Sequence, residues 1–310
     1  MPLRAFLAAL VLGVFASQAR ATDVVGYGEA FNVLYSVDLT TRTASLIGGA
    51  TLNGVPVNLY GLTFSPNGVL YAVSDANAVK SLLTIDQTTG QATLVGQLNL
   101  GTNAQLDLAL AFTCDGKLWM SASTGQFWSV DPSTAATTAL GNLGVTLTGL
   151  AARGSLLFGA GGQGNNNLYA IDPIKATANP IGAYGTSNYI TAASPAFDST
   201  GQLWAILDYV PPPGGTTIAP WSDLALMSPK SGILTNLGNI TPPAPINTNS
   251  LAYQSLFQIG LKGLAIPSGI CAATANLVST PALSWRGIAA LIVLTLLLGG
   301  TRLRRRRPSC

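Results

Sequence analysis

A short pattern recurs five times along this chain at a fixed internal spacing, and it limits the folds that the chain can adopt. Each copy alternates like a half-buried strand, ends at an Asp or a Ser, and is followed ten residues later by a glycine. The Asp suits a turn because its carboxylate accepts hydrogen bonds from backbone N–H groups. The pattern predicts five hairpins, at 34–38 with Gly48, 82–86 with Gly96, 127–131 with Gly141, 168–172 with Gly182 and 224–228 with Gly238.

A second hairpin precedes the first in the repeating period. Strand-like residues on both sides surround glycine turns at Gly68, Gly116, Gly154 and Gly201. Four strands in a period of about 40 to 55 residues are typical of one β-propeller blade.

The two ends of the repeat region complete the strand count. Residues 24–27 and the first Asp hairpin supply three strands, and 263–267 supply a fourth, so we expect the chain ends to share a blade. The sequence therefore predicts an all-β, five-bladed propeller over 22–267. Six blades are the alternative, because 239–262 is long enough to contain another hairpin.

The repeat resembles propellers of the quinoprotein or YVTN type, at the level of architecture and over Val24 to Pro267. The tryptophan that ends each quinoprotein repeat is missing here. We therefore expect no quinone, and we expect no other cofactor. Trp119, Trp128 and Trp204 occupy strand positions and are expected to pack in the core.

The composition excludes several kinds of site. The chain has no histidine, which excludes a Ser-His-Asp or Cys-His nucleophile and any His-ligated metal. We predict no catalytic or metal-binding residues. The repeated Asp38, Asp86, Asp131 and Asp172 are expected to form turns, because calcium needs six to eight converging oxygens and these carboxylates fall one to a blade. Cys114 and Cys271 are expected either to form a disulfide or to remain free thiols.

The first 21 residues have the order of parts of a signal peptide. Arg4 is followed by an apolar stretch from Phe6 to Ala16, and Ala19 and Ala21 form an A-x-A cleavage site. We expect export across the inner membrane, with the export machinery and signal peptidase as partners and Thr22 as the first mature residue.

The other end has the length of a membrane span. Residues 284–303 are apolar except for Arg286 and Arg302, and a helix of this length would span ~30 Å. The cluster Arg304, Arg305, Arg306 and Arg307 in the tail 304–310 should stay cytoplasmic. We therefore predict a transmembrane helix that anchors the body outside the inner membrane.

A short motif precedes this apolar segment. Within the linker 268–283 and the start of the helix, its residues are Pro281, Leu283, Ser284, Trp285 and Gly287. Motif, helix and arginine cluster together resemble the IPTL-CTERM type of bacterial sorting signal, which exosortase-type membrane proteases handle. Ala282 stands where the motif has Thr, and Trp285 lies one place early. The resemblance implies an exosortase-type partner, cleavage near the motif and transfer to the cell surface; without cleavage the chain stays in the membrane.

Net charge does not favour nucleic acid as a partner. The chain has 15 Lys and Arg against 12 Asp and Glu, but eight of the basic residues lie in the signal and the tail. The predicted propeller keeps seven basic and twelve acidic groups, so its net charge is −5.

The longest insertions indicate which face of the propeller carries function. Residues 208–223 and 239–262 both map to the face where binding sites of propellers usually lie. The candidate binding residues are Trp221, Tyr209 and Asp208, with Trp221 suited to stack on a sugar or anchor a protein. Asp75 and Asp107 are expected on the same face as Asp208, without any sign that the three converge.

Three functions remain open on these grounds. We favour a surface-directed binding or interaction module for a glycan or protein, rather than an enzyme. The first alternative is a hydrolase or lyase that uses carboxylates and a metal, which a chain with the single glutamate Glu29 fits poorly. The second is a structural component of an extracellular matrix.

Overall fold

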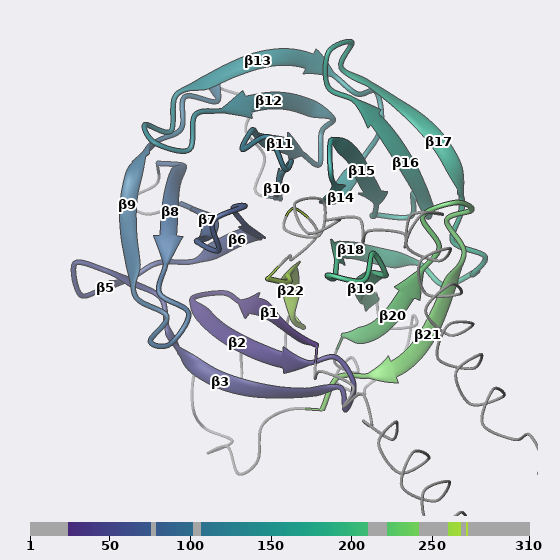
Figure 1. Ribbon diagram of the computed structural model, residues 1–310, viewed down its shortest axis with the longest axis horizontal. Coiled ribbons are helices and arrows are strands. Elements are labelled where there is room, and N and C mark those ends of the chain that lie inside the picture. The colour runs from purple at the N-terminus through teal and green to yellow at the C-terminus, as the bar shows by residue number, and fades with distance from the viewer. Residues whose placement is uncertain are drawn as a thin grey trace, which may run out of the picture. The chain divides into compact units, whose positions relative to one another are not determined.

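The computed structural model describes residues 24–75, 79–101, 107–209, 222–241, 260–267 and Cys271. All of its strands belong to one compact unit, Met1–Ile270, and Cys271 is the described residue of the second unit, Cys271–Cys310. Five sheets are arranged radially around a common axis (Figure 1). The predicted signal peptide, linker, membrane segment and tail lie outside the described residues, as do Ala19, Ala21, Trp221 and the sorting motif.

Each blade is an antiparallel sheet of four strands in which sequence neighbours pair. From the inner strand outward, the blades that follow one another along the chain are β6 (Leu59–Phe64), β7 (Leu70–Ser74), β8 (Ser81–Ile85) and β9 (Ala92–Gln97); β10 (Leu108–Phe112), β11 (Leu118–Ala122), β12 (Gln126–Val130) and β13 (Thr137–Asn142); β14 (Leu147–Arg153), β15 (Leu156–Gly161), β16 (Asn167–Asp172) and β17 (Thr177–Ala183); β18 (Ile190–Phe197), β19 (Leu203–Tyr209), β20 (Asp223–Met227) and β21 (Leu234–Asn239).

The remaining blade joins the two ends of the repeat region. Its strands β1 (Val25–Ala30), β2 (Val33–Asp38) and β3 (Thr43–Gly49) come first in the chain, and its inner strand β22 (Lys262–Ala265) comes last. Inner strands of neighbouring blades contact one another all the way round, so the ring closes with five blades. The five-bladed prediction and the shared terminal blade are therefore confirmed. An additional small hairpin, β4 (Thr51–Leu52) with β5 (Val55–Pro56), was not predicted.

The four Asp residues form the predicted turns. Each accepts backbone N–H groups two and three residues ahead or the nearby hydroxyl; Asp86 Oδ1, for example, accepts from Thr88 N at 2.8 Å and Thr89 N at 2.9 Å. These hydrogen bonds stabilise the charged carboxylate and lower the pKa of Asp86 to about 2.

The glycine ten residues after each turn residue marks a β-bulge. In every outer strand the register shifts just before this glycine, which leaves the preceding residue without an opposite partner. That residue packs instead, partly buried, in the apolar cluster shared with the next blade. The five bulge residues are Ile47, Val95, Leu140, Ile181 and Leu237.

These glycines are also the closest points between blades. A β-carbon at Gly48, Gly96 or Gly182 would lie within 3.0 Å of the carbonyl oxygen of Thr89, Thr134 or Ser231, each in the hairpin turn of the next blade. At the other two junctions Gly141 meets Ala176, and Gly238 meets Arg42, whose Nη1 donates to the Leu237 carbonyl. The spacing read from the sequence is therefore the spacing of the contacts between blades.

The core consists of one apolar cluster at each of the five junctions. Trp119 and Trp128 are buried there, and Trp119 stacks on Phe127 at a centroid separation of 5.8 Å. Trp204 is half-buried, and its Nε1 donates to Asp198 at 2.9 Å. All three tryptophans pack as predicted.

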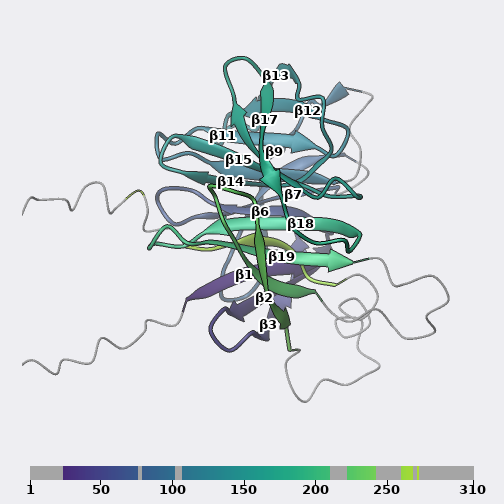
Figure 2. The same cartoon turned by 90° about the vertical axis from the view of Figure 1, so that its right-hand side faces the viewer.

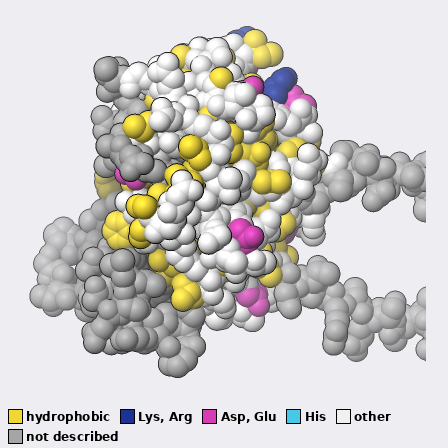
Figure 3. Space-filling model, turned by 90° about the vertical axis from the view of Figure 1, so that its left-hand side faces the viewer, with side chains coloured by type: hydrophobic (Ala, Val, Ile, Leu, Met, Phe, Trp, Pro, Cys, Tyr) yellow, Lys and Arg dark blue, Asp and Glu magenta, His cyan; other side chains and the backbone are white. Residues whose placement is uncertain are grey.

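Charged side chains are sparse on the outer surface, and apolar ones are scattered over the side shown in Figure 3. Cys114 and Cys271 are both disulfide-bonded, which is the oxidised alternative of the two that the sequence left open. No helix within the described residues is long and apolar enough to cross a membrane, and 284–303 is not among them.

Strand direction determines which loops share a face. In the side view β18 and β19 run antiparallel across the unit from one face to the other (Figure 2). Because the inner strands all run the same way round the ring, they begin on one face, which we call the mouth face. The loops between second and third strands and those between blades open on the mouth face, and the Asp turns lie on the opposite face.

The bulge glycines provide a stability test. We expect Gly48→Ala to lower the free energy of unfolding by about 1–3 kcal/mol, because its β-carbon would overlap the Thr89 carbonyl of the next blade. The adjacent Gly49 is the matched control, since its nearest neighbour would be Asn32 O at 3.9 Å. Gly49→Ala should be neutral or stabilising by up to about 1 kcal/mol. Equal chemical denaturation midpoints for the two variants would contradict the close contact.

Candidate functional site

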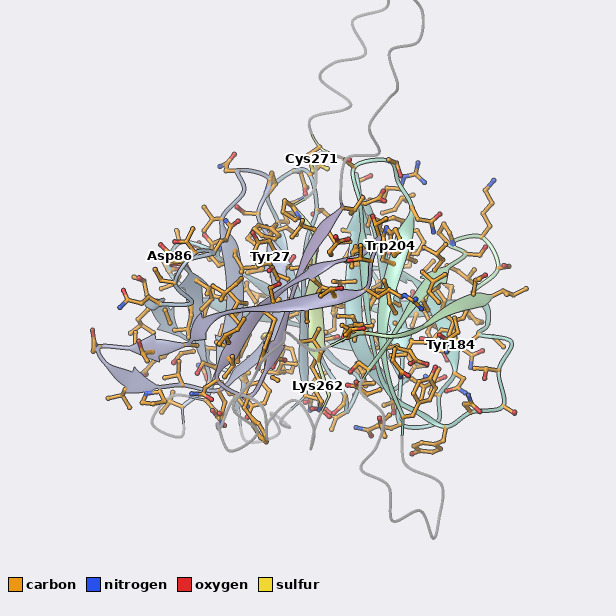
Figure 4. The ribbon with its side chains drawn as sticks, turned by 90° about the horizontal axis from the view of Figure 1, so that it is seen from below. Tyr27, Asp86, Tyr184, Trp204, Lys262 and Cys271 are labelled. Atoms are coloured by element: carbon orange, nitrogen blue, oxygen red, sulfur yellow. The ribbon has the colours of Figure 1, made fainter. Side chains whose placement is uncertain are left out.

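A cavity of about 40 Å³ opens where the inner strands begin, at the mouth of the central channel. Its walls come from all five inner strands and from β1. The polar side chains that line it are those of Glu29, Tyr60, Asp107, Thr148, Ser194 and Lys262. Lys262 points to the mouth face in Figure 4, opposite the face toward which Asp86 lies.

The closure of the ring positions Glu29 and Lys262. They are directly opposed across the antiparallel pair of β1 and β22. From Tyr27 to Glu29 the first strand advances by two residues while β22 advances by three, so β22 carries an extra residue here. Gly263 absorbs it with a φ of 58°, a conformation that favours glycine, and its N–H donates to Ser194 Oγ at 3.1 Å.

Glu29 is a buried carboxyl without a hydrogen bond inside the described part of the chain. Its side chain lines the cavity, yet the residue is only 3% exposed. Burial raises its pKa to about 8, although the ammonium of Lys262 acts in the opposite direction; the charges of Asp208 and Asp107 raise it further. At neutral pH Glu29 is therefore mainly a neutral acid, able both to donate and to accept.

Asp208 is buried behind this site in a local network. Its Oδ1 accepts the hydroxyl of Ser222, and Ser222 Oγ accepts from Leu261 N at 2.7 Å. Burial raises the pKa of Asp208 to about 7, opposed by the Ser222 hydrogen bond and by Lys262. This network holds the chain where it re-enters the ring at Gly260, whose φ is 81°.

The charged groups at the cavity rim are more open. Lys262 Nζ lies 3.9 Å from Asp107 Oδ1, and the two side chains are 36% and 41% exposed. Gln163 Nε2 donates to the second Asp107 oxygen at 3.4 Å. Such a half-exposed pair is weak, so both groups keep capacity for a ligand.

A second group supports the Tyr60 wall. The Tyr60 hydroxyl donates to Asp75 Oδ2 at 2.9 Å, and the Lys80 ammonium lies 4.3 Å from the centre of its ring. Burial lowers the pKa of Lys80, against the attraction of Asp75 and Asp107. Asp75 and Asp107 thus reach the same mouth.

The predicted binding residues occupy different places. Asp208 contributes to the electrostatics of the mouth but lies in the Ser222 network. Tyr209 packs at the junction of two blades, where its hydroxyl accepts from Asn236 Nδ2 at 3.2 Å and burial raises its pKa to about 12. Trp221 is outside the described residues. Their role in binding stays a prediction.

Sequence reasoning missed Glu29 and Lys262 as partners, because they are far apart in the chain and meet only through ring closure. A comparison of blades would have identified Glu29. The residues at its register position in the other blades, opposite the first residue of each Asp or Ser pattern, are small or apolar: Val73, Ser121, Ala160 and Ile206.

No metal centre is assigned at this mouth. Within the described ranges no group of three or more Asp, Glu or Cys side chains is placed to hold a metal ion. The arrangement instead offers a neutral acid, an ammonium and a carboxylate around a small opening, a set that can donate and accept hydrogen bonds at once.

Comparisons with known proteins agree in fold only. No protein-family model matches the sequence, and no curated protein matches it. Among solved structures, TolB from Acinetobacter baumannii is 14% identical with a TM-score of 0.46, over 79% of this chain and 67% of that one.

A chain of the nidogen/laminin complex is 12% identical with a TM-score of 0.48, over 79% of this chain and 98% of that one. Hydrazine synthase from Kuenenia stuttgartiensis is 13% identical with a TM-score of 0.40, over 67% of this chain and 60% of that one. At these identities and scores, the likenesses carry no argument about function.

Proposed function

We propose that the protein is an exported binding module that takes its ligand at the mouth face, over the cavity between Glu29 and Lys262. The observation that carries this proposal is Glu29, a 3% exposed carboxyl that faces a cavity with no hydrogen bond among the described residues. A buried polar group without a partner lowers stability, and such groups gather at functional sites. The two longest loops open on the same face.

A carboxylate-dependent hydrolase or lyase is the second candidate. Glu29 and Asp208 both have raised pKa values, about 8 and about 7, as a general acid at neutral pH requires. Asp208 is engaged by Ser222 and does not line the cavity, so the second carboxyl of such a pair would have to be Asp107. Binding needs none of these roles, and we therefore prefer it.

Localisation is part of the proposal. An A-x-A site at Ala19 and Ala21, an apolar segment at 284–303 and four final arginines support export, a membrane anchor and a body outside the inner membrane. The Pro281 to Gly287 motif supports handling by an exosortase-type protease and transfer to the surface.

The tail can be tested directly. We expect mass spectrometry of the protein recovered from the cell surface to find a C-terminus before Trp285, because the motif lies between the propeller and the apolar segment. An intact chain ending at Cys310 in the membrane fraction would show a permanent anchor instead. The N-terminal peptide, expected to begin at Thr22, is read in the same experiment.

Binding at the mouth face can be tested with immobilised protein and an extract of the producing cells' envelope. We expect saturable retention, measured by biolayer interferometry, that falls at least about tenfold in Lys262→Met because a rim donor is lost. Lys175→Met is the matched control, since Lys175 is 76% exposed and forms an ion pair with Asp172 on the opposite face. Equal retention by both variants would refute the site, and unsaturable retention would favour a structural role.

The buried acids predict an unusual pH dependence of stability. In the unfolded chain Glu29 and Asp208 ionise near 4.5 and 3.8, but in the folded chain they stay protonated up to about 8 and about 7. Raising the pH through this window therefore favours unfolding, by up to about 1.4 kcal/mol per pH unit for each group.

We expect the free energy of unfolding to fall from about pH 5 to about pH 8, as followed by urea titrations. Glu29→Gln should flatten the part above pH 7, where Glu29 alone still holds its proton. Asp86→Asn, on the opposite face, should leave this window unchanged, since Asp86 titrates near pH 2. A wild-type stability that is constant between pH 5 and 8 would contradict the burial of neutral acids.

A further inference from the structure

The size of the mouth cavity limits what can enter it. Its volume of about 40 Å³ compares with the roughly 30 Å³ that one water occupies in the liquid. A whole small molecule does not fit, but one functional group of a larger ligand does. The rest of that ligand must then lie over the mouth face.

The charges at the mouth argue against a charged group. An anion would lie beside the Asp107 carboxylate and would force Glu29 to remain protonated. An ammonium would meet Lys262, which already lies 3.9 Å from the Asp107 oxygen that such a cation would seek. A divalent cation lacks a set of three acidic ligands among the described residues. A neutral polar group avoids all three conflicts.

The available hydrogen-bonding atoms suit a hydroxyl group. Lys262 offers donors, Asp107 offers acceptors, and the protonated Glu29 offers one of each. A hydroxyl both donates and accepts, so it can satisfy Glu29 and one rim group together. The Glu29 carboxyl, 97% buried and unpartnered in the described chain, is the group that needs such a ligand most.

The remaining wall is apolar. Leu62, Leu150, Leu264 and the ring of Pro195 complete the lining around the polar atoms. Apolar walls with a few placed polar groups are usual in ligand sites, and they suit the C–H surface of a sugar ring next to its hydroxyls.

We infer that the channel mouth binds a neutral carbohydrate, and that one hydroxyl or hydroxymethyl group of a sugar unit enters the cavity to hydrogen-bond Glu29 while Lys262 and Asp107 hold a neighbouring hydroxyl. This inference rests on the proposed function and specifies its ligand class. The polymer extends over the mouth face, and recognition depends on neutral hydrogen bonding rather than on charge pairing.

The experiment measures binding of the full chain, purified in mild detergent, to three kinds of polysaccharide by biolayer interferometry. The neutral probes are dextran, galactomannan and xyloglucan, the anionic probe is polygalacturonate, and the cationic probe is chitosan. We expect at least one neutral polysaccharide to bind saturably and the charged ones to bind more weakly.

Two substitutions at Glu29 test the chemistry. Glu29→Met removes the donor and acceptor and should weaken the neutral polysaccharide at least about tenfold. Glu29→Gln keeps a donor and an acceptor and should stay within about threefold of wild type. Asp86→Asn on the opposite face is the control for the removal of a carboxylate, and its affinity should equal that of the wild type. Thermal unfolding confirms that each variant is folded.

Several outcomes overturn the inference, and they separate it from the proposed function. Absence of neutral binding, neutral binding that Glu29→Met leaves unchanged, or a loss in Glu29→Gln as large as in Glu29→Met would each refute the carbohydrate class. If envelope retention still depends on Lys262 in that case, the mouth is a binding site for another ligand. If retention is also insensitive to Lys262→Met, the proposed function fails with it.

Discussion

The propeller depends on one repeated contact, in which a bulge glycine of each outer strand lies against the hairpin turn of the next blade. At Gly48, Gly96 and Gly182 the neighbouring atom is a backbone carbonyl, so no side chain larger than hydrogen fits without movement. The bulge also turns one apolar residue, such as Ile47 or Val95, into the cluster between blades. The same residues thus shape the strand and define the distance between sheets.

Closure of the ring uses a modified form of this contact. At the last junction Arg42 replaces the usual turn backbone, and its guanidinium donates to the Leu237 carbonyl beside Gly238. Backbone hydrogen bonds between Thr241 and the Arg42–Ala44 segment add to it. Closure places β22 beside β1, and this pairing alone brings Glu29 opposite Lys262. The candidate site is therefore a consequence of how the chain ends meet.

The fold was predictable because its signals are local and repeated. The Asp turns, the glycine at a constant offset and the four-strand period each follow from a few adjacent residues, and five copies reinforce one another. The small hairpin β4–β5 occurs once and has no such support. The site was harder, because the proximity of Glu29 to Lys262 depends on a register between strands more than 230 residues apart, and an extra residue at Gly263 determines that register.

Glu29 is the residue that the repeat alone does not explain. The other four blades place Val73, Ser121, Ala160 and Ile206 at its position, all buried, so an apolar or small residue satisfies the packing there. A glutamate adds a carboxyl whose burial raises its pKa to about 8 and destabilises the fold at neutral pH. Because the fold itself gains nothing from this carboxyl, its presence at the only cavity to which all five inner strands and β1 contribute among the described residues is best understood through a ligand.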